Sequence, residues 1–183
     1  MLHEGPVRLS WILAVAAWAA TAHASPGVTV YQSPTNPAIT EGETVVDGDP
    51  ASIYQVVLDY PRWVEVFPDI AKVIVKSQHG VEALVTLVHP DGNRDNLRFK
   101  NQPAARMVYF EDTGNKHAEV WGEIVFVPGD QPGTTRVHTR LYADVHGLAT
   151  LVVSDRDVRR MRDTKIARDL EHVRMYFHRM SSR

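Results

Sequence analysis

The stretch Asp49–Ile70, DPASIYQVVLDYPRWVEVFPDI, decides how the rest of this chain can be interpreted. Asp49 is a favourable N-cap, and Pro50 suits the first turn of a helix, where no backbone N–H is needed. The pair Tyr60-Pro61 ends that helix, because the residue before a proline is pushed out of the α region. Pro61 then begins a second short helix, so the stretch predicts two short helices with one sharp break between them.

Strand-like runs lie on both sides of these two helices. Glu41–Asp47 predicts the first strand, and Ser25–Thr40 before it, which holds three prolines, predicts an irregular lead-in with Val28–Tyr31 extended. Short turns such as Pro90–Asn93 join most of the later runs, which indicates an antiparallel sheet. The further strands are expected at Ala71–Lys76, Val81–His89, Asp95–Lys100, Ala105–Glu111, His117–Val127 and Thr134–Asp144.

The C-terminal segment Asp155–Arg183 predicts one long helix, with Ser154 or Asp155 as its N-cap. It carries nine basic and five acidic side chains, which we expect to form a solvated outer face. The alternative is a basic patch that makes transient contact with an anionic membrane surface. The apolar positions of the helix recur every three to five residues, at Val158, Met161, Ile166, Leu170, Val173, Phe177 and Met180.

The order of these elements, together with DYPRW and FPDI, resembles the START-like helix-grip superfamily over about residues 41–180. Two later motifs are similar to patterns of that group, namely Gly122-x-Ile124-x-Phe126-x-Pro128 and the GTTRV run at 133–137. The first has Ile where Trp is common, and the second has one extra residue. The resemblance implies an α+β fold, in which a curved antiparallel sheet of about seven strands surrounds the long C-terminal helix. The two short helices would close one end, and residues 41–183 would form a ligand-binding domain.

Such a fold implies an apolar cavity between sheet and helix, because a curved sheet and one helix cannot fill all the space between them. Strand alternation and helix periodicity then select the side chains expected to face inward, and Trp63 and Phe67 are placed near the mouth. Tyr109 is the polar group expected inside, whereas His138 is expected to point outward with Arg136 and Arg140. The candidate cavity residues are Trp63, Phe67, Val73, Val75, Leu87, Met107, Tyr109, Ile124, Phe126, Val137, Leu141, Val158, Met161, Ile166 and Leu170.

Composition excludes several classes of function. The chain has 183 residues, the usual size of one domain, and a net charge of −2 that gives no reason to expect nucleic acid as a partner. It has no Cys, so thiolate nucleophiles, thiolate metal sites and disulfides are excluded. Its nine His show no metal-ligand spacing such as HExxH, so we expect no metal site and no cofactor. The chain is expected to be a monomer.

The N-terminus has the features of a secretory signal. Arg8 precedes an apolar run, Leu9–Ala20, and Ala-His-Ala at 22–24 fits the small-x-small cleavage pattern. The sequence therefore predicts a signal peptide at residues 1–24, cleaved after Ala24, and a periplasmic or secreted protein. An uncleaved membrane anchor is the alternative, although the apolar run is short for a membrane span.

Three functions remain open at this point. The first is the binding of a hydrophobic small molecule such as a lipid, a sterol-like compound or a quinone, which could extend to its transport. The second is a polyketide cyclase/dehydrase-type enzyme, which would need an inward ionisable group with a shifted pKa. The third is a protein-interaction module of the same fold. The apolar lining and the missing catalytic signature favour the carrier, and within it the segment Val145–Val153 could serve as a lid.

Overall fold

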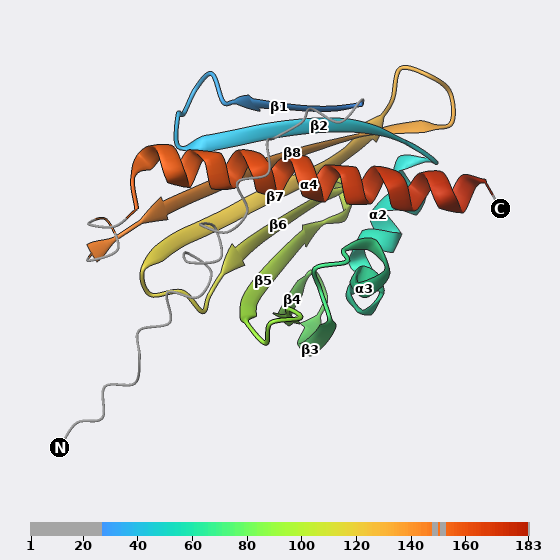
Figure 1. Ribbon diagram of the computed structural model, residues 1–183. Helices are drawn as coiled ribbons and strands as arrows, with labels where there is room; N and C mark the ends of the chain where they lie inside the picture. The colour runs from blue at the N-terminus through green and yellow to red at the C-terminus, as the bar shows by residue number, and fades with distance from the viewer. Residues whose placement is uncertain (1–26, 148–149, 151–152, 183) are drawn as a thin grey trace.

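One curved antiparallel sheet wraps around one long helix in the computed structural model, which describes residues 27–147, 150 and 153–182 (Figure 1). The eight strands have the order β1-β2-β8-β7-β6-β5-β4-β3, so the chain has the expected α+β helix-grip architecture with one strand more. The elements are β1 (Val28–Gln32), β2 (Ile39–Asp47), α2 (Pro50–Leu58), η2 (Tyr60–Arg62), α3 (Trp63–Val66), β3 (Lys72–His79), β4 (Glu82–Val88), β5 (Arg94–Gln102), η3 (Pro103–Ala105), β6 (Met107–Asp112), β7 (Ala118–Pro128), β8 (Thr134–Val145) and α4 (Asp155–Ser181).

The additional strand lies in the expected lead-in. β1 pairs antiparallel with β2 over its full length, from Val28 opposite Thr44 to Gln32 opposite Thr40. β2 itself begins at Ile39, two residues before the expected strand. Residues 28–32 and 39–40 are therefore regular sheet, and the prolines Pro34 and Pro37 fall in the loop between the two strands.

The two short helices form as their local signals predict. The Asp49 carboxylate accepts hydrogen bonds from the backbone N–H groups of Ala51 and Ser52, both at 3.0 Å, and so caps α2. The helix ends at Leu58, before Tyr60-Pro61, and a 3₁₀ turn leads into the single turn of α3. The indole N–H of Trp63 donates to the Val57 carbonyl at 2.9 Å, which ties α3 back to α2.

The long helix α4 lies across the concave face of the sheet (Figure 1). Ser154 and Asp157 form a reciprocal capping box at its start, so Ser154 is the N-cap. Ile166 and Leu170 pack against β2 at Gly42, where a Cβ would overlap the Ile166 side chain and lie 2.9 Å from Leu170 Cδ1. A glycine at this position therefore lets the helix approach the sheet backbone.

One basic side chain of α4 faces the sheet instead of solvent, contrary to the expected outer charged face. Arg162 is 4% exposed, and its guanidinium donates to the carbonyls of Ala143 at 2.9 Å and Pro37 at 3.2 Å. Its Nε also donates to the Thr40 hydroxyl at 3.3 Å. These bonds fix the N-terminal half of α4 to β8, β2 and the loop before β2, and they satisfy a buried charge that would otherwise be costly.

Two expectations fall wholly or partly outside the described residues. Residues 1–24, the expected signal peptide, lie outside them, and so do 148–149 and 151–152 of the expected lid. Val145, the first residue of that segment, is the last residue of β8. Within the ranges that the structure describes, no helix has the length and apolar character needed to cross a membrane.

We expect Gly42→Ala to lower the free energy of unfolding by about 1–3 kcal/mol, because the added methyl group forces α4 away from β2. Val45→Ala is the matched control, since Val45 is on the same strand and 47% exposed on the opposite face, and it should cost within about 0.5 kcal/mol. Urea unfolding measures both changes. Equal stability of the two variants would contradict the close approach.

Candidate functional site

An apolar cavity lies between the two short helices, the sheet and the C-terminal half of α4. Its walls come from α2, α3, β7, β8 and α4, together with Phe67 just after α3. None of the lining side chains carries an ionisable group, so the lining offers dispersion and hydrophobic contacts alone. The lining residues are Val56, Val57, Trp63, Val66, Phe67, Ile124, Phe126, Val137, Val173 and Phe177.

The cavity is small in this closed arrangement. Its volume is about 40 Å³, whereas pockets for small-molecule ligands usually measure about 300–1,000 Å³. A guest of ordinary size would therefore have to push the walls apart. The contact between α3 and α4 closes one side, where Phe67 meets the His172 ring edge-on with centroids 6.3 Å apart, and Asp69 pairs with Arg168 at 2.9 Å.

A wider depression of about 320 Å³ lies over β3, β4 and β5, away from this cavity. Its lining mixes charged side chains, Glu82, Arg98 and Lys100, with Leu84 and other small or polar groups. Leu84 and Arg98 are direct neighbours across β4 and β5 on the outer face of the sheet. The lining of this depression mixes polar and apolar groups, whereas that of the cavity is wholly apolar, so the cavity is the better candidate for an apolar guest.

The structure brings together five of the residues that the sequence selected for the cavity. They come from the segment after α2 and from the last two strands, and they line the cavity directly. Others point to the concave side but are packed in the main core elsewhere, under the edge of the sheet or beneath the middle of α4. The cavity-lining residues are Trp63, Phe67, Ile124, Phe126 and Val137. The core residues are Val73, Val75, Leu87, Leu141, Ile166 and Leu170.

Val158 and Met161 lie at the opposite end of the helix from the cavity. They pack in a separate small cluster with Ala118, Ala143 and Val145. The sequence periodicity of α4 identified its apolar face, but it did not indicate which half of the helix lies over the cavity. The lining residues that we had not selected are Val56, Val57, Val66, Val173 and Phe177.

The expectation that Met107 and Tyr109 face inward is wrong. Val108 is fully buried on the concave face, so its neighbours in β6 point to the convex face. There the Tyr109 ring stacks on Trp121 with centroids 6.2 Å apart. Neither side chain can therefore contact a guest in the cavity.

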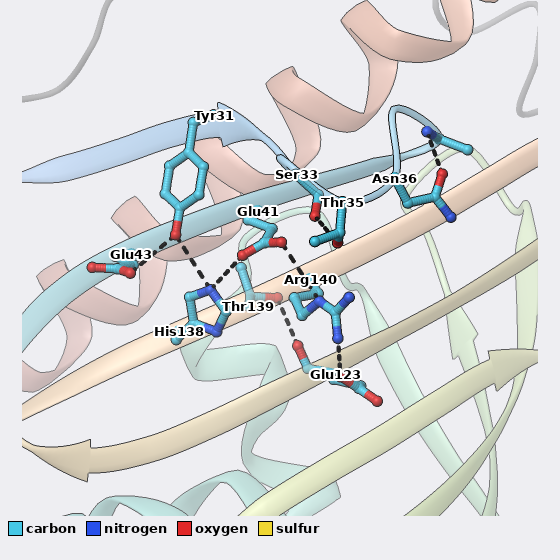
Figure 2. Close-up of polar contacts among 11 residues, drawn as sticks. Tyr31, Ser33, Thr35, Asn36, Glu41, Glu43, Glu123, His138, Thr139 and Arg140 are labelled. Carbon is cyan, nitrogen blue, oxygen red and sulfur yellow. Dashed lines mark hydrogen bonds and ion pairs between the residues drawn. The ribbon is translucent and has the colours of Figure 1, made fainter.

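A network of charged and polar side chains lies on the convex face of β1, β2, β8 and β7 (Figure 2). Glu41 Oε2 is 3.1 Å from His138 Nε2, and Glu41 Oε1 is 3.7 Å from Arg140 Nε. Arg140 also pairs with Glu123 at 3.2 Å. The Tyr31 hydroxyl donates to Glu43 at 3.1 Å, and it lies 3.5 Å from His138 Nε2. The network links four neighbouring strands, and His138 points outward as expected.

The pKa shifts in this network stabilise the arrangement seen. Hydrogen bonding from Ser33, and then the nearby His138 and Arg140, lower the pKa of Glu41, so its carboxylate stays ionised. Burial and the carboxylates Glu43 and Glu41 raise the pKa of Tyr31 to about 12, so its hydroxyl stays a hydrogen-bond donor. Both effects favour cross-strand pairing, and the network has no contact with the cavity lining.

His172 is a titratable side chain at the α3–α4 contact, beside the Asp69–Arg168 pair. Burial lowers its pKa, and its Nδ1 is buried with no hydrogen-bond partner among the described residues. A histidine with a lowered folded-state pKa is protonated more readily in the unfolded chain as the pH falls below about 6.5. The stability that neutral His172 supports is therefore present above that pH and is lost as the pH falls toward the folded-state pKa.

We predict that His172→Gln reduces the loss of stability between about pH 7 and about pH 5. His89 acts in the opposite sense, because its hydrogen bond with Asp95 raises its pKa, so that its contribution is kept at acid pH and lost as the pH rises. Urea unfolding midpoints of the native protein and of His172→Gln, measured across this pH range, give the difference between their slopes of stability against pH. Parallel pH profiles would show that His172 does not control this contact.

Comparisons with known proteins bear on the fold. No protein-family model and no curated protein matches the sequence. Among solved structures, a START superfamily protein from Mycobacterium smegmatis is similar with a TM-score of 0.65 and 14% identity, over 78% of this chain and 98% of that one. A protein from Thermus thermophilus has a TM-score of 0.66 and 14% identity, over 78% and 99%.

The Zhui aromatase/cyclase from a Streptomyces species is similar as well, with a TM-score of 0.61 and 14% identity over 82% of this chain and 91% of that one. Structural similarity at 14% sequence identity is evidence for the fold alone. It agrees with the motifs at 60–70, 122–128 and 133–137, and with the sheet and helix order described above. The chain therefore has the START-like helix-grip fold that its sequence predicted.

Proposed function

We propose that this protein binds a hydrophobic small molecule in the cavity between α2, α3, β7, β8 and α4, and shields it from water. The observation that carries the proposal is the wholly apolar lining of an internal cavity in a START-like fold. Burial of a Leu-sized group contributes about 1.5–3 kcal/mol. A guest that buries several such groups could reach micromolar affinity, about −8 kcal/mol, without any charge pairing.

The distribution of ionisable groups supports binding over catalysis. A cyclase-type enzyme needs a general acid or base beside its substrate. The Glu41–His138–Arg140 network is on the convex face, and the lining of the cavity contains no such group. The fold is shared with an aromatase/cyclase, so proton-transfer catalysis stays the alternative. It would require a guest to reach groups behind the present lining, such as His172, which packs against Phe67.

Opening of the cavity is part of the proposal. The α3 segment is a single helical turn between Pro61 and Pro68, and it meets α4 through Phe67–His172 packing and the Asp69–Arg168 pair. Movement of this segment away from α4 would break these two contacts and would require Trp63, which packs on Tyr60 and Phe99, to shift with it. A guest could enter there, with the sheet and most of α4 unchanged.

Contact with an anionic membrane stays a prediction. Arg162 is turned inward, and Arg168, Arg159 and Arg174 pair with nearby carboxylates, so these four side chains contribute less to a basic surface than the sequence suggested. Their pairing weakens the electrostatic argument for a membrane-facing helix. The protein-interaction role and the monomeric state likewise stay predictions.

We expect Val173→Phe to reduce uptake of an apolar guest about tenfold or more, because the larger side chain occupies cavity space that the guest would otherwise fill. Each CH₂ group of the guest that can no longer be buried costs about 0.8 kcal/mol of binding free energy. Met175→Phe on the same helix is the control, since Met175 is 42% exposed, and it should leave uptake unchanged. Native mass spectrometry against a panel of lipids, sterols and quinones measures both. Equal uptake by both variants, or no uptake by the native protein, would contradict the proposal.

We further propose that residues 1–24 direct the chain out of the cytoplasm, on the strength of Arg8, the apolar run Leu9–Ala20 and the Ala-His-Ala pattern. Fused to a reporter that is active only outside the cytoplasm, residues 1–30 should give activity, and the exported protein should begin at Ser25. Replacing Leu13 and Val15 by charged residues should abolish export. Activity with an intact N-terminus would favour the membrane anchor instead.

A further inference from the structure

Two buried tyrosines stand directly behind two of the rings that line the cavity. Tyr54 of α2 is 3% exposed and packs edge-on against Phe126, with ring centroids 6.0 Å apart. Tyr60 is 0% exposed and packs against Trp63, with centroids 5.6 Å apart. Phe126 and Trp63 both line the cavity. The tyrosines therefore form the layer immediately next to the cavity wall.

The two hydroxyl groups differ in how they are satisfied. The Tyr60 hydroxyl and the side chain of Asn101, which is 7% exposed, bond to each other at 3.2–3.4 Å. The Tyr54 hydroxyl is buried and has no hydrogen-bond partner in the part of the chain that the structure describes. Buried polar groups in folded proteins are nearly always hydrogen-bonded, because an unpaired one destabilises the fold. A donor in this position, one ring away from the cavity, calls for a partner that the described residues do not supply.

Both hydroxyls are neutral donors under ordinary conditions. Burial raises the pKa of Tyr54, and burial, together with the neighbouring Tyr54, raises the pKa of Tyr60. An unpaired neutral donor in an apolar surrounding suits a neutral acceptor, since a charged guest would lose its hydration without gaining a counter-ion.

We propose that the Tyr54 hydroxyl is the polar end of the ligand site, and that the guest is an apolar molecule with a ketone- or quinone-type carbonyl oxygen. This inference rests on the proposed function, which places the apolar body of the guest in the cavity. Phe126 contacts both the cavity and the Tyr54 ring, so a change in its position would let the carbonyl reach the hydroxyl. The carbonyl then accepts the hydrogen bond that Tyr54 lacks, and this fixes the orientation of the guest.

The test compares 2-acetylnaphthalene with 2-ethylnaphthalene, which share a carbon skeleton and differ in the carbonyl oxygen. Calorimetric titration of the full chain gives the ratio of their affinities. We expect Tyr54→Phe to weaken binding of the ketone about 3- to 10-fold, the usual effect of one hydrogen bond, and to leave binding of the hydrocarbon unchanged. Tyr109→Phe is the control, because Tyr109 lies on the convex face, and it should change neither affinity.

Stability of the ligand-free variants gives a second, independent readout. Tyr54→Phe removes an unpaired hydroxyl, so its thermal midpoint should equal or exceed that of the native protein, whereas Tyr60→Phe breaks the bond to Asn101 and should lower it. A lowered midpoint for Tyr54→Phe would overturn the inference, since the hydroxyl would then have a structural partner. Equal losses for ketone and hydrocarbon would overturn it too, and leave the proposed function intact. Binding of neither compound by the native protein would overturn both.

Discussion

The close approach of α4 to the sheet at Gly42 determines where the helix, and with it the cavity, can lie. The missing side chain there allows Ile166 and Leu170 to rest on β2, and Arg162 fixes the preceding turn through the carbonyls of Ala143 and Pro37. The middle of the helix is thereby held against β2 and β8. Its C-terminal half then crosses the space in front of β7 and β8, and that space is what α2 and α3 close.

Strand alternation separates two chemical environments across the sheet. The convex face carries the ionisable groups, which pair across neighbouring strands, as Glu41 does with Arg140 and His138. The cavity lies on the concave side, and its lining is apolar. Buried polar groups also lie on the concave side, and they include Arg162, Thr40 and the Tyr60–Asn101 pair, which are hydrogen-bonded. The Tyr54 hydroxyl differs from them in having no partner among the described residues. An apolar site with one polar end is typical of proteins that bind apolar molecules in a defined orientation.

Much of the fold could be predicted because its signals are local. Asp49-Pro50, Tyr60-Pro61 and Ser154 mark helix boundaries through capping and proline sterics, which depend on neighbouring residues alone. Which residues of β6 face the core could not be predicted, because four consecutive residues are apolar and strand alternation cannot choose between the two sets. They are Met107, Val108, Tyr109 and Phe110.

The candidate site was predictable only in part, for reasons of long-range geometry. Trp63, Phe67 and Phe126 could be placed near the cavity from the fold resemblance, but the position of the cavity along α4 depends on where Gly42 holds that helix. Arg162 shares its helix face with Val158 and Ile166, at a spacing of four residues, and this signal could have identified it as inward-facing. The pairing of Glu41 with His138 requires the register of β2 and β8, which no local pattern contains.

The proposed function requires that the internal cavity, and not the outer surface, receives the apolar guest. Methyl-resolved NMR of the full chain during titration with 2-ethylnaphthalene tests it most directly. We expect saturable shifts at the methyl groups of Ile124, Val137 and Val173, which come from three different elements of the cavity wall. Shifts confined to Val81 and Leu84, which are exposed on the far part of the sheet, would contradict it.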